Sequence, residues 1–255
     1  MIRTWYNIAM LKKPQTFVSF EEFALSAEMQ GVTLGELAKK VGVKIGDLRV
    51  VVTGDGKFRF FGERGAVPCP KDFEITYEIS NYVREFGITN LTIPDSVTSI
   101  GDNAFYGYTS LKSISIPSSV KNIGYRAFYG CSSLESVSIP DSVESIGNNA
   151  FSHCTSLKSM TIPNSVTSIG YAVFASCASL ESVSIPDSVK SIGIYAFCDC
   201  ASLKSISIPD SVESIGEWAF YKCTYLESVS IPDSAKSIGE SVFYGCRAIP
   251  VRRRP

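Results

Sequence analysis

Six cysteines recur at a spacing of 23 residues and are the first candidates for chemistry: Cys131, Cys154, Cys177, Cys200, Cys223 and Cys246. Thiolates bind metals and form disulfides, whereas protonated thiols pack as small apolar groups. Zinc sites need clustered ligands or tight Cys-x-x-Cys pairs. Cys198 and Cys200 are separated by a single residue, which is closer than in a Cys-x-x-Cys pair, and this arrangement occurs once. We therefore expect buried free thiols that pack in a core, with no metal and no cofactor; disulfides and metal binding are the alternatives.

The lone histidine and a column of aspartates are weaker candidates for chemistry. His153 precedes Cys154, but a Cys/His nucleophile pair would need a packed thiol to turn outward. An acidic residue follows a proline in most repeats, at Asp95, Asp141, Asp187, Asp210 and Asp233. One carboxylate per repeat lacks a second set of calcium ligands, so we interpret the column as turn residues that bond their own backbone. The sequence also contains no phosphate-binding loop, no Gly-x-Ser-x-Gly motif and no paired carboxylates, and we predict no enzyme.

Two sets of side chains are candidates for binding a partner. The first, called the aromatic strip, comprises Tyr106, Tyr125, Tyr129, Tyr171, Tyr195, Trp218, Tyr221, Tyr225 and Tyr244. The second, called the strand face, comprises Ser115, Ser138, Thr161, Ser184, Ser207 and Ser230. Tyrosine and tryptophan dominate protein interfaces because they bury much area at a low entropy cost. We favour the aromatic strip for this reason; the alternative is that its rings only pack on one another.

These residues are positioned by an internal repeat. Seven prolines stand 23 residues apart without an insertion, at Pro94, Pro117, Pro140, Pro163, Pro186, Pro209 and Pro232. The repeat reads approximately L-x-S-I-x-I-P-x-S-V-x-S-I-G-x-x-A-F-x-x-C-x-S. A unit of 23 residues cannot enclose a core alone, so each unit must bury its apolar side against its neighbours.

The pattern within one unit predicts a coil. Ile206, Ser207 and Ile208 alternate as in a strand with one buried face, and Pro209 should end the ladder because it has no amide donor. Gly216 suits a tight bend. We expect one strand per coil, stacked into a single parallel sheet, with the repeated phenylalanine forming a continuous aromatic spine.

The repeat resembles the BspA-like class of leucine-rich repeats over residues 88–249. The residues that carry the resemblance in one unit are Leu203, Ile206, Ile208, Pro209, Val212, Ile215, Gly216, Ala219, Phe220 and Cys223. Ser211 stands where an asparagine ladder is usual in leucine-rich repeats. The resemblance implies an α/β-type solenoid with a stacked parallel sheet, and a non-catalytic protein that is exposed at a surface and binds other proteins or matrix.

Residues 1–87 differ in composition, and we expect a small α+β domain that caps the first coil. Ser19 and Glu22 form a capping box. Apolar residues at helical spacing predict a second helix, at Leu34, Leu37, Ala38, Val41 and Val43. Asp55-Gly56 predicts a hairpin. The alternative is a winged helix-turn-helix whose recognition segment is residues 44–52, "KIGDLRVVV", which would make the protein a DNA-binding regulator.

The chain ends in Arg252, Arg253 and Arg254, and we expect residues 250–255 to be a solvated basic tail. No cap is evident after residue 249. We therefore expect either a homodimer through this end or a truncated array. The start, "MIRTWYNIAMLKKPQ", lacks the features of a secretory signal, which favours a cytoplasmic location; the resemblance favours the cell surface. A formal net charge of −1 provides no field that attracts nucleic acid, and no apolar run is long enough to insert in a membrane.

Charges alternate along the repeat. The residue after each leucine position alternates between lysine and glutamate, at Lys112, Glu135, Lys158, Glu181, Lys204 and Glu227. Stacked strands lie about 5 Å apart, so each lysine should face a glutamate on the neighbouring coils and help to fix their register. The sequence as a whole predicts a non-catalytic scaffold that binds protein partners; the alternatives are a cell-surface adhesin and a DNA-binding regulator.

Overall fold

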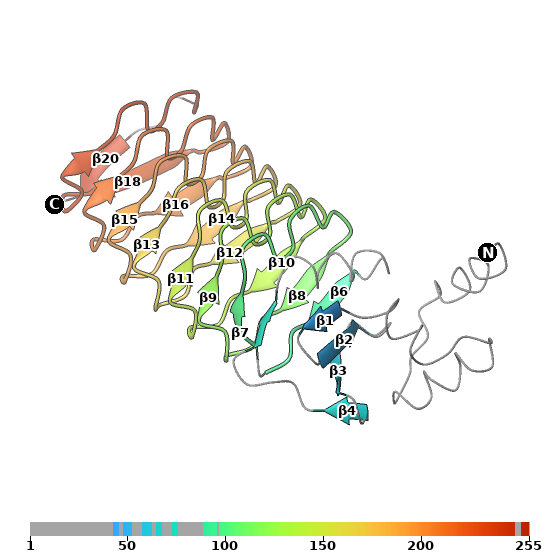
Figure 1. Ribbon diagram of the computed structural model, residues 1–255. Helices are drawn as coiled ribbons and strands as arrows, with labels where there is room; N and C mark the ends of the chain where they lie inside the picture. The colour runs from blue at the N-terminus through green and yellow to red at the C-terminus, as the bar shows by residue number, and fades with distance from the viewer. Residues whose placement is uncertain are drawn as a thin grey trace.

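The computed structural model describes residues 89–95 and 97–247, together with the strands at 43–45, 48–52, 58–62, 65–67, 73–75 and 251–254. The repeats form a solenoid of stacked coils (Figure 1). Each complete coil has two short strands followed by a side made of turns. All strand pairs between coils are parallel. The strands therefore form two series along the solenoid, and the expectation of a single stacked sheet is wrong.

The first series carries the Ser-x-Ser segments and ends in a strand from the C-terminus. It comprises β6 (Asn90–Thr92), β8 (Ser113–Ser115), β10 (Ser136–Ser138), β12 (Ser159–Thr161), β14 (Ser182–Ser184), β16 (Ser205–Ser207), β18 (Ser228–Pro232) and β20 (Val251–Arg254). Hydrogen bonding divides this series into a three-stranded sheet, β10-β8-β6, and a five-stranded sheet, β12-β14-β16-β18-β20. In the middle strands the central apolar residue is buried and the flanking residues are exposed, as the alternation predicts.

The second series follows the proline corner. It comprises β5 (Phe73–Ile75), β7 (Val97–Ile100), β9 (Asn122–Ile123), β11 (Ser145–Ile146), β13 (Ser168–Ile169), β15 (Ser191–Ile192), β17 (Ser214–Ile215) and β19 (Ser237–Ile238). It is divided between β11 and β13. Both series are thus interrupted at the same junction between coils.

The third side of each coil is a run of turns. Trp218 and Lys222 illustrate the reason: both have left-handed backbone conformations, with φ of 58° and 55°. Equivalent positions in the other coils repeat this geometry, which a right-handed helix cannot accommodate. Across the part of the chain that the structure describes there is no helix. The fold is a parallel-strand β-solenoid, and the α/β assignment needs this correction.

Phenylalanine rings form the predicted spine along the core. The rings of successive coils stack with centroids 5.1–5.7 Å apart and interplanar angles of 3–12°. The six from Phe105 to Phe220 are fully buried. Offset stacking of this kind stabilises aromatic pairs beyond the area that they bury. The constant period places each ring over the previous one, so the spine depends on register.

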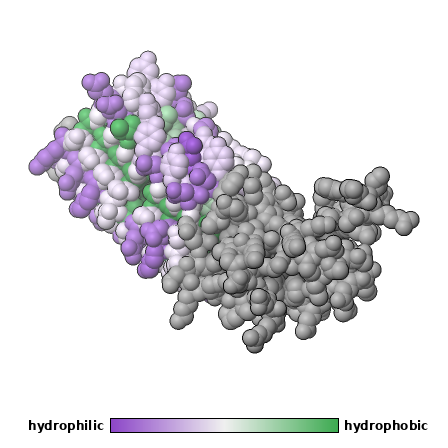
Figure 2. All heavy atoms as spheres, viewed as in Figure 1, coloured by the Kyte–Doolittle hydropathy of each residue, from purple (hydrophilic) through white to green (hydrophobic). Residues whose placement is uncertain are grey.

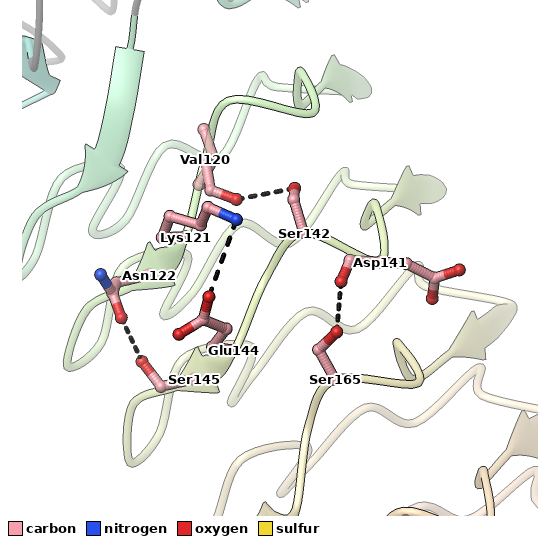
Figure 3. A network of polar contacts seen from close by, with 8 residues as sticks. All are labelled: Val120, Lys121, Asn122, Asp141, Ser142, Glu144, Ser145 and Ser165. Atoms are coloured by element: carbon pink, nitrogen blue, oxygen red, sulfur yellow. Dashed lines mark hydrogen bonds and ion pairs between the residues drawn. The ribbon is translucent and has the colours of Figure 1, made fainter.

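Serine replaces the usual asparagine ladder with hydrogen bonds between coils. The hydroxyls of Ser119, Ser142, Ser188, Ser211 and Ser234 donate to a valine carbonyl of the preceding coil at 2.7–2.8 Å. Figure 3 shows one of these bonds, from Ser142 to Val120. Each bond satisfies a partly buried carbonyl that the short strands leave outside their ladders.

The N-terminal region contains an antiparallel sheet of β1 (Val43–Ile45), β2 (Leu48–Val52), β3 (Phe58–Gly62) and β4 (Gly65–Val67). The hairpin around Asp55-Gly56 is confirmed, since Val52 pairs with Phe58. Val43 lies in β1 rather than in a helix. Residues 44–45 lie in β1 and residues 48–52 lie in β2, both paired with neighbouring strands, so these residues do not form the recognition helix of a winged helix. The predicted helices around residues 19–42 lie outside the described residues.

Both ends of the solenoid differ from the predicted boundaries. At one end, β5 pairs with β7 and Ile75 is buried in the core, so the array begins before residue 88. At the other end, β20 pairs with β18. Residues 251–254 therefore form the edge strand of the first series rather than a solvated tail, and the end that we expected to be uncapped is extended by this strand.

The close stacking of coils generates a test at the glycine column. A Cβ added at Gly193 would lie 2.7 Å from the backbone carbonyl group of Gly170, whereas one added at Gly170 would meet the side chain of Asn148 and no nearby backbone. We expect Gly193→Ala to lower the free energy of unfolding by about 1–3 kcal/mol and Gly170→Ala to lower it less, because a side chain can move aside. Urea unfolding of both variants measures the difference. Equal losses would contradict the described packing.

Candidate functional site

The strand face is a regular column on the outside of the first series. Ser138 pairs in register with Ser115, Thr161 with Ser184 and Ser207 with Ser230. All are exposed except Ser230, which is half-buried. The side chains are small and uncharged, so the structure gathers the predicted residues in a line but supplies no large anchor there.

The aromatic strip separates into two clusters on the turn side. In the first cluster, the rings of Tyr106 and Tyr129 stack at 5.1 Å, and Tyr129 also contacts the ring of His153 at 5.1 Å. The Arg126 guanidinium lies 4.9 Å from the Tyr125 ring centroid and 5.2 Å from that of Tyr129. The Arg126 guanidinium thus makes cation–π contacts with two rings of this cluster.

The second cluster, called the C-terminal aromatic cluster, comprises Tyr171, Tyr195, Trp218, Tyr221 and Tyr244. Trp218 is its centre: its ring lies 6.4 Å from Tyr195, 5.0 Å from Tyr221 and 5.9 Å from Tyr244. Tyr171 contacts Tyr195 at 5.9 Å. These rings therefore pack on one another across neighbouring coils. Tyr171 and Tyr244 nevertheless remain exposed.

Tyr225 was predicted with the strip but lies apart from it. The side chain is 66% exposed, and among the described residues no ring contact joins it to another aromatic side chain. It occupies a different column of the repeat, two residues after Cys223. The sequence analysis did not assign Arg126 and His153 to the aromatic clusters. Arg126 occupies the same repeat column as Trp218, and His153 occupies the same column as Lys222. These shared columns are the signal that could have identified both residues.

The C-terminal aromatic cluster has backbone strain at its centre. Tyr195 and Trp218 have φ of 57° and 58°, a conformation that costs a bulky residue about 1–2 kcal/mol. Each is held there by a backbone hydrogen bond to the next coil, Tyr195 N to Glu217 O at 3.1 Å and Trp218 N to Glu240 O at 3.2 Å. The same conformation recurs at this column in the other coils, for example at Asn103 and Ser241, so it belongs to the repeat geometry rather than to this cluster alone.

Charges accompany the cluster. Glu217 and Glu240 are exposed beside it, and the Lys222 ammonium lies 5.0 Å from the Tyr221 ring centroid. The hydrogen bond with the Tyr221 hydroxyl raises the pKa of Lys222 above its ordinary value. In Figure 2 hydrophilic and hydrophobic residues alternate over the described surface, without one continuous patch of either kind.

The cysteine column is buried, which confirms the packing interpretation. Cys131, Cys154, Cys177, Cys200 and Cys223 are fully buried free thiols, and Cys246 is half-buried. Each Sγ donates a hydrogen bond to the carbonyl of a phenylalanine 26 residues earlier, at 3.0–3.2 Å. The sequence did not reveal this bond. Burial raises the pKa of Cys177 to about 12, so its thiol stays protonated.

The weaker candidates for chemistry do not assemble. The Cys154 thiol donates to Phe128 O at 3.2 Å while His153 packs on Tyr129, so the two do not form a nucleophile pair. Asp141 Oδ1 accepts from the amide of Asn164 at 2.9 Å, which is a bond to the next coil rather than to its own backbone. Within the described ranges no group of three metal-ligating side chains is close enough to hold an ion.

Ion pairs confirm part of the alternating charge column. Lys158 Nζ lies 3.6 Å from Glu135 and Lys204 Nζ lies 2.6 Å from Glu181. The hydrogen bond from Lys204 lowers the pKa of Glu181. These side chains are exposed, so each pair stabilises little and its role is to favour one register. The described residues include no helix that is long and apolar enough to cross a membrane.

The two strand series, the phenylalanine spine and the aromatic turn side define a repeat protein of the solenoid class. The sequence matches the model of the BspA-type leucine-rich repeat region over residues 78–204 and 190–251. The chain therefore belongs to the BspA-type leucine-rich repeat family, as the resemblance indicated. The matched region begins at residue 78, before the predicted boundary at residue 88 and after the end of β5.

The chain is similar to several solved structures. A leucine-rich cell surface protein from Faecalibacterium prausnitzii is 29% identical, with a TM-score of 0.53 and alignment over 84% of this chain and 76% of that one. A leucine-rich repeat protein from Bacteroides ovatus is 26% identical, with a TM-score of 0.46 over 81% and 69% of the two chains. One from T. pallidum is 29% identical, with a TM-score of 0.43 over 64% and 78%. None of the curated protein sequences matches this chain.

Burial of the thiols predicts the order in which they react. In the native protein at pH 8 we expect an alkylating reagent to modify half-buried Cys246 well before Cys131, Cys154, Cys177 or Cys200, because the latter are fully buried and protonated thiols do not attack. Peptide mass mapping during the reaction measures the order, with urea-unfolded protein as the control. Rapid native labelling of Cys177 would contradict the packed column.

Proposed function

We propose that this protein is a non-catalytic scaffold that binds a protein partner through the C-terminal aromatic cluster. The proposal is supported by the membership in a leucine-rich repeat family and by an outer surface that presents large rings. The observation that carries it is Trp218, whose ring contacts those of Tyr195, Tyr221 and Tyr244 and so forms a pre-stacked aromatic surface. The left-handed backbone at this column recurs in the other coils and belongs to the repeat, whereas the residue type at the column varies from coil to coil.

The cluster is a better contact than the strand face for a physical reason. A pre-stacked ring loses little side-chain entropy on binding and can bury a large area. The strand-face hydroxyls, including that of Ser207, are short and offer few anchors. They permit a partner's backbone to approach closely, so the strand face remains the second candidate surface.

We further propose a location at the cell surface, where the protein would act as an adhesin. The support is the Faecalibacterium prausnitzii structure, which is that of a leucine-rich cell surface protein. The DNA-binding alternative has lost its main argument, since residues 44–45 and 48–52 lie in paired strands rather than in a helix. The chain belongs to a family that is built from repeats, and we recognise no catalytic motif in its sequence. Both points support a role without catalysis.

Matched variants test the proposed contact. Full-length protein is immobilised, and proteins from the surface of host cells and from the matrix that they contact are captured and quantified. We expect Trp218→Ala to lower the retention of a specific partner about tenfold or more, as is typical of a hot-spot residue. The control Tyr225→Ala removes an exposed ring outside the cluster, and Ser207→Ala removes a strand-face hydroxyl; both should retain the partner. Loss with Ser207→Ala and retention with Trp218→Ala would contradict the proposal.

A further inference from the structure

The junction between the coil of β10 and β11 and the coil of β12 and β13 differs from its neighbours on both strand sides. At the preceding junction Gly147 N donates to Ile123 O at 2.8 Å, and at the following one Gly193 N donates to Ile169 O at 2.7 Å. The equivalent bond from Gly170 N to Ile146 O is absent from the described backbone. The bond from Thr167 N to Glu144 O is likewise absent, whereas Lys190 N donates to Thr167 O at 2.8 Å.

The backbones of the two coils are also farther apart at the glycine corner. A Cβ placed on Gly147 would lie 2.5 Å from the carbonyl carbon of Gly124, and one on Gly193 would lie 2.7 Å from that of Gly170. On Gly170 the nearest atom is the side-chain oxygen of Asn148, and the next atoms, 3.7 Å away, also belong to side chains. The separation between these two coils therefore extends along their second strands, from Thr167 to the corner at Gly170.

Side chains bridge this junction where backbone pairing is missing. Asn148 Oδ1 accepts from Tyr171 N at 2.9 Å, and Asp141 Oδ1 accepts from Asn164 N at 2.9 Å. The Ser165 hydroxyl bonds Asp141 O at 2.5 Å instead of a valine carbonyl. Figure 3 shows this bond next to the regular one between Ser142 and Val120. Side chains have a longer and more adaptable reach than the backbone groups that they replace.

The turn side is continuous across the same junction. Four backbone bonds cross it: Asn149 N to Tyr171 O, Phe151 N to Val173 O and His153 N to Ala175 O at 2.8–2.9 Å, and Ser179 N to Thr155 O at 3.2 Å. The Cys177 thiol also bonds Phe151 O at 3.1 Å. The Phe151 and Phe174 rings still stack, at 5.7 Å, the widest spacing along the spine. The two coils are thus closed on the turn side and open along their second strands, while on the first strand side Lys158 N still donates to Glu135 O at 3.3 Å.

A cleft of about 610 Å³ lies at the open corner. It is lined by residues 137–141 and 161–164 with Ser184 and Pro186. The only charged side chain in the lining is Asp141, which is already bonded to Asn164. Val137 and Ile146 of the core are only partly buried beside the opening. The lining thus lacks a charged anchor for a ligand, and the cleft marks the separation of the coils.

We propose that this junction is a hinge built into the solenoid. The coils before it and the coils after it are two rigid blocks, each with continuous ladders on its strand sides. They pivot on the turn side, where bonds and stacking are continuous. Closing the hinge brings Thr167 toward Glu144 and changes the tilt of the strand faces of the two blocks, while the aromatic side moves little. The charge column is also broken here, because Thr167 stands between Glu144 and Lys190.

Amide exchange of the full-length protein tests the opening. We expect Gly170 N–H and Thr167 N–H to exchange with solvent about tenfold or more faster than the matched amides of Gly193 and Lys190, because the latter are bonded in the ladder. Residue-resolved exchange by NMR measures the four rates. Equal protection at all four amides would overturn the proposal.

Engineered disulfides test the movement. The pair Glu144→Cys with Thr167→Cys spans the junction, and Lys190→Cys with Glu213→Cys is the matched control within a rigid block, where the two backbones are bonded. We expect the control pair to oxidise quickly and the junction pair to oxidise more slowly but completely, and then to restore protection of the Gly170 amide. A junction pair that oxidises as fast as the control, or that never oxidises, would overturn the hinge. Mass mapping identifies the bond and distinguishes it from any disulfide that the half-buried thiols of Cys198 and Cys246 form.

Discussion

The structure depends on one constraint: a coil of 23 residues cannot bury its own phenylalanine. Each ring is covered by the ring before it and the ring after it, so a coil is stable only when its neighbours are in register. The serine hydroxyls and cysteine thiols act in the same way, because each bonds a carbonyl of the preceding coil. Every repeated polar residue in the core thus connects coils rather than completing one coil.

This constraint explains why the chemistry suggested by the cysteines and aspartates does not appear. A thiol that is needed to satisfy a buried carbonyl points inward and stays protonated, as the raised pKa of Cys177 shows. Asp141 is used to bridge two coils. The turn side differs from the strand sides because its residue type varies between coils while its backbone conformation does not.

The repeat could be predicted from the sequence because its period is free of insertions. The spine, the buried thiols and the Asp55-Gly56 hairpin were predicted from local patterns and confirmed. The second strand was missed because Ser214-Ile215 is too short to show alternation. The turn side was not recognised because bulky residues such as Trp218 rarely adopt positive φ. The division of the aromatic strip also escaped prediction, since it depends on which columns face one another.

Some features are set by the ends and the junction rather than by the repeat. The arginines after Pro250 look like a solvated tail in the sequence, but their backbone extends the first series as β20. The open junction follows no strong local signal beyond Thr167 and Asn164, because it arises from how two whole coils pack. A periodic sequence predicts the average coil well and its departures poorly.

The register claim is tested most directly by unfolding two deletion variants. Removing residues 180–202 deletes one complete unit and joins Ser179 to Leu203 in the same column; removing residues 180–201 deletes one residue fewer and shifts every later column by one position. The account predicts that the first variant unfolds cooperatively with a moderately lower midpoint in urea, whereas the second loses the cooperative transition of the coils beyond the deletion. Indistinguishable unfolding curves for the two variants would contradict it.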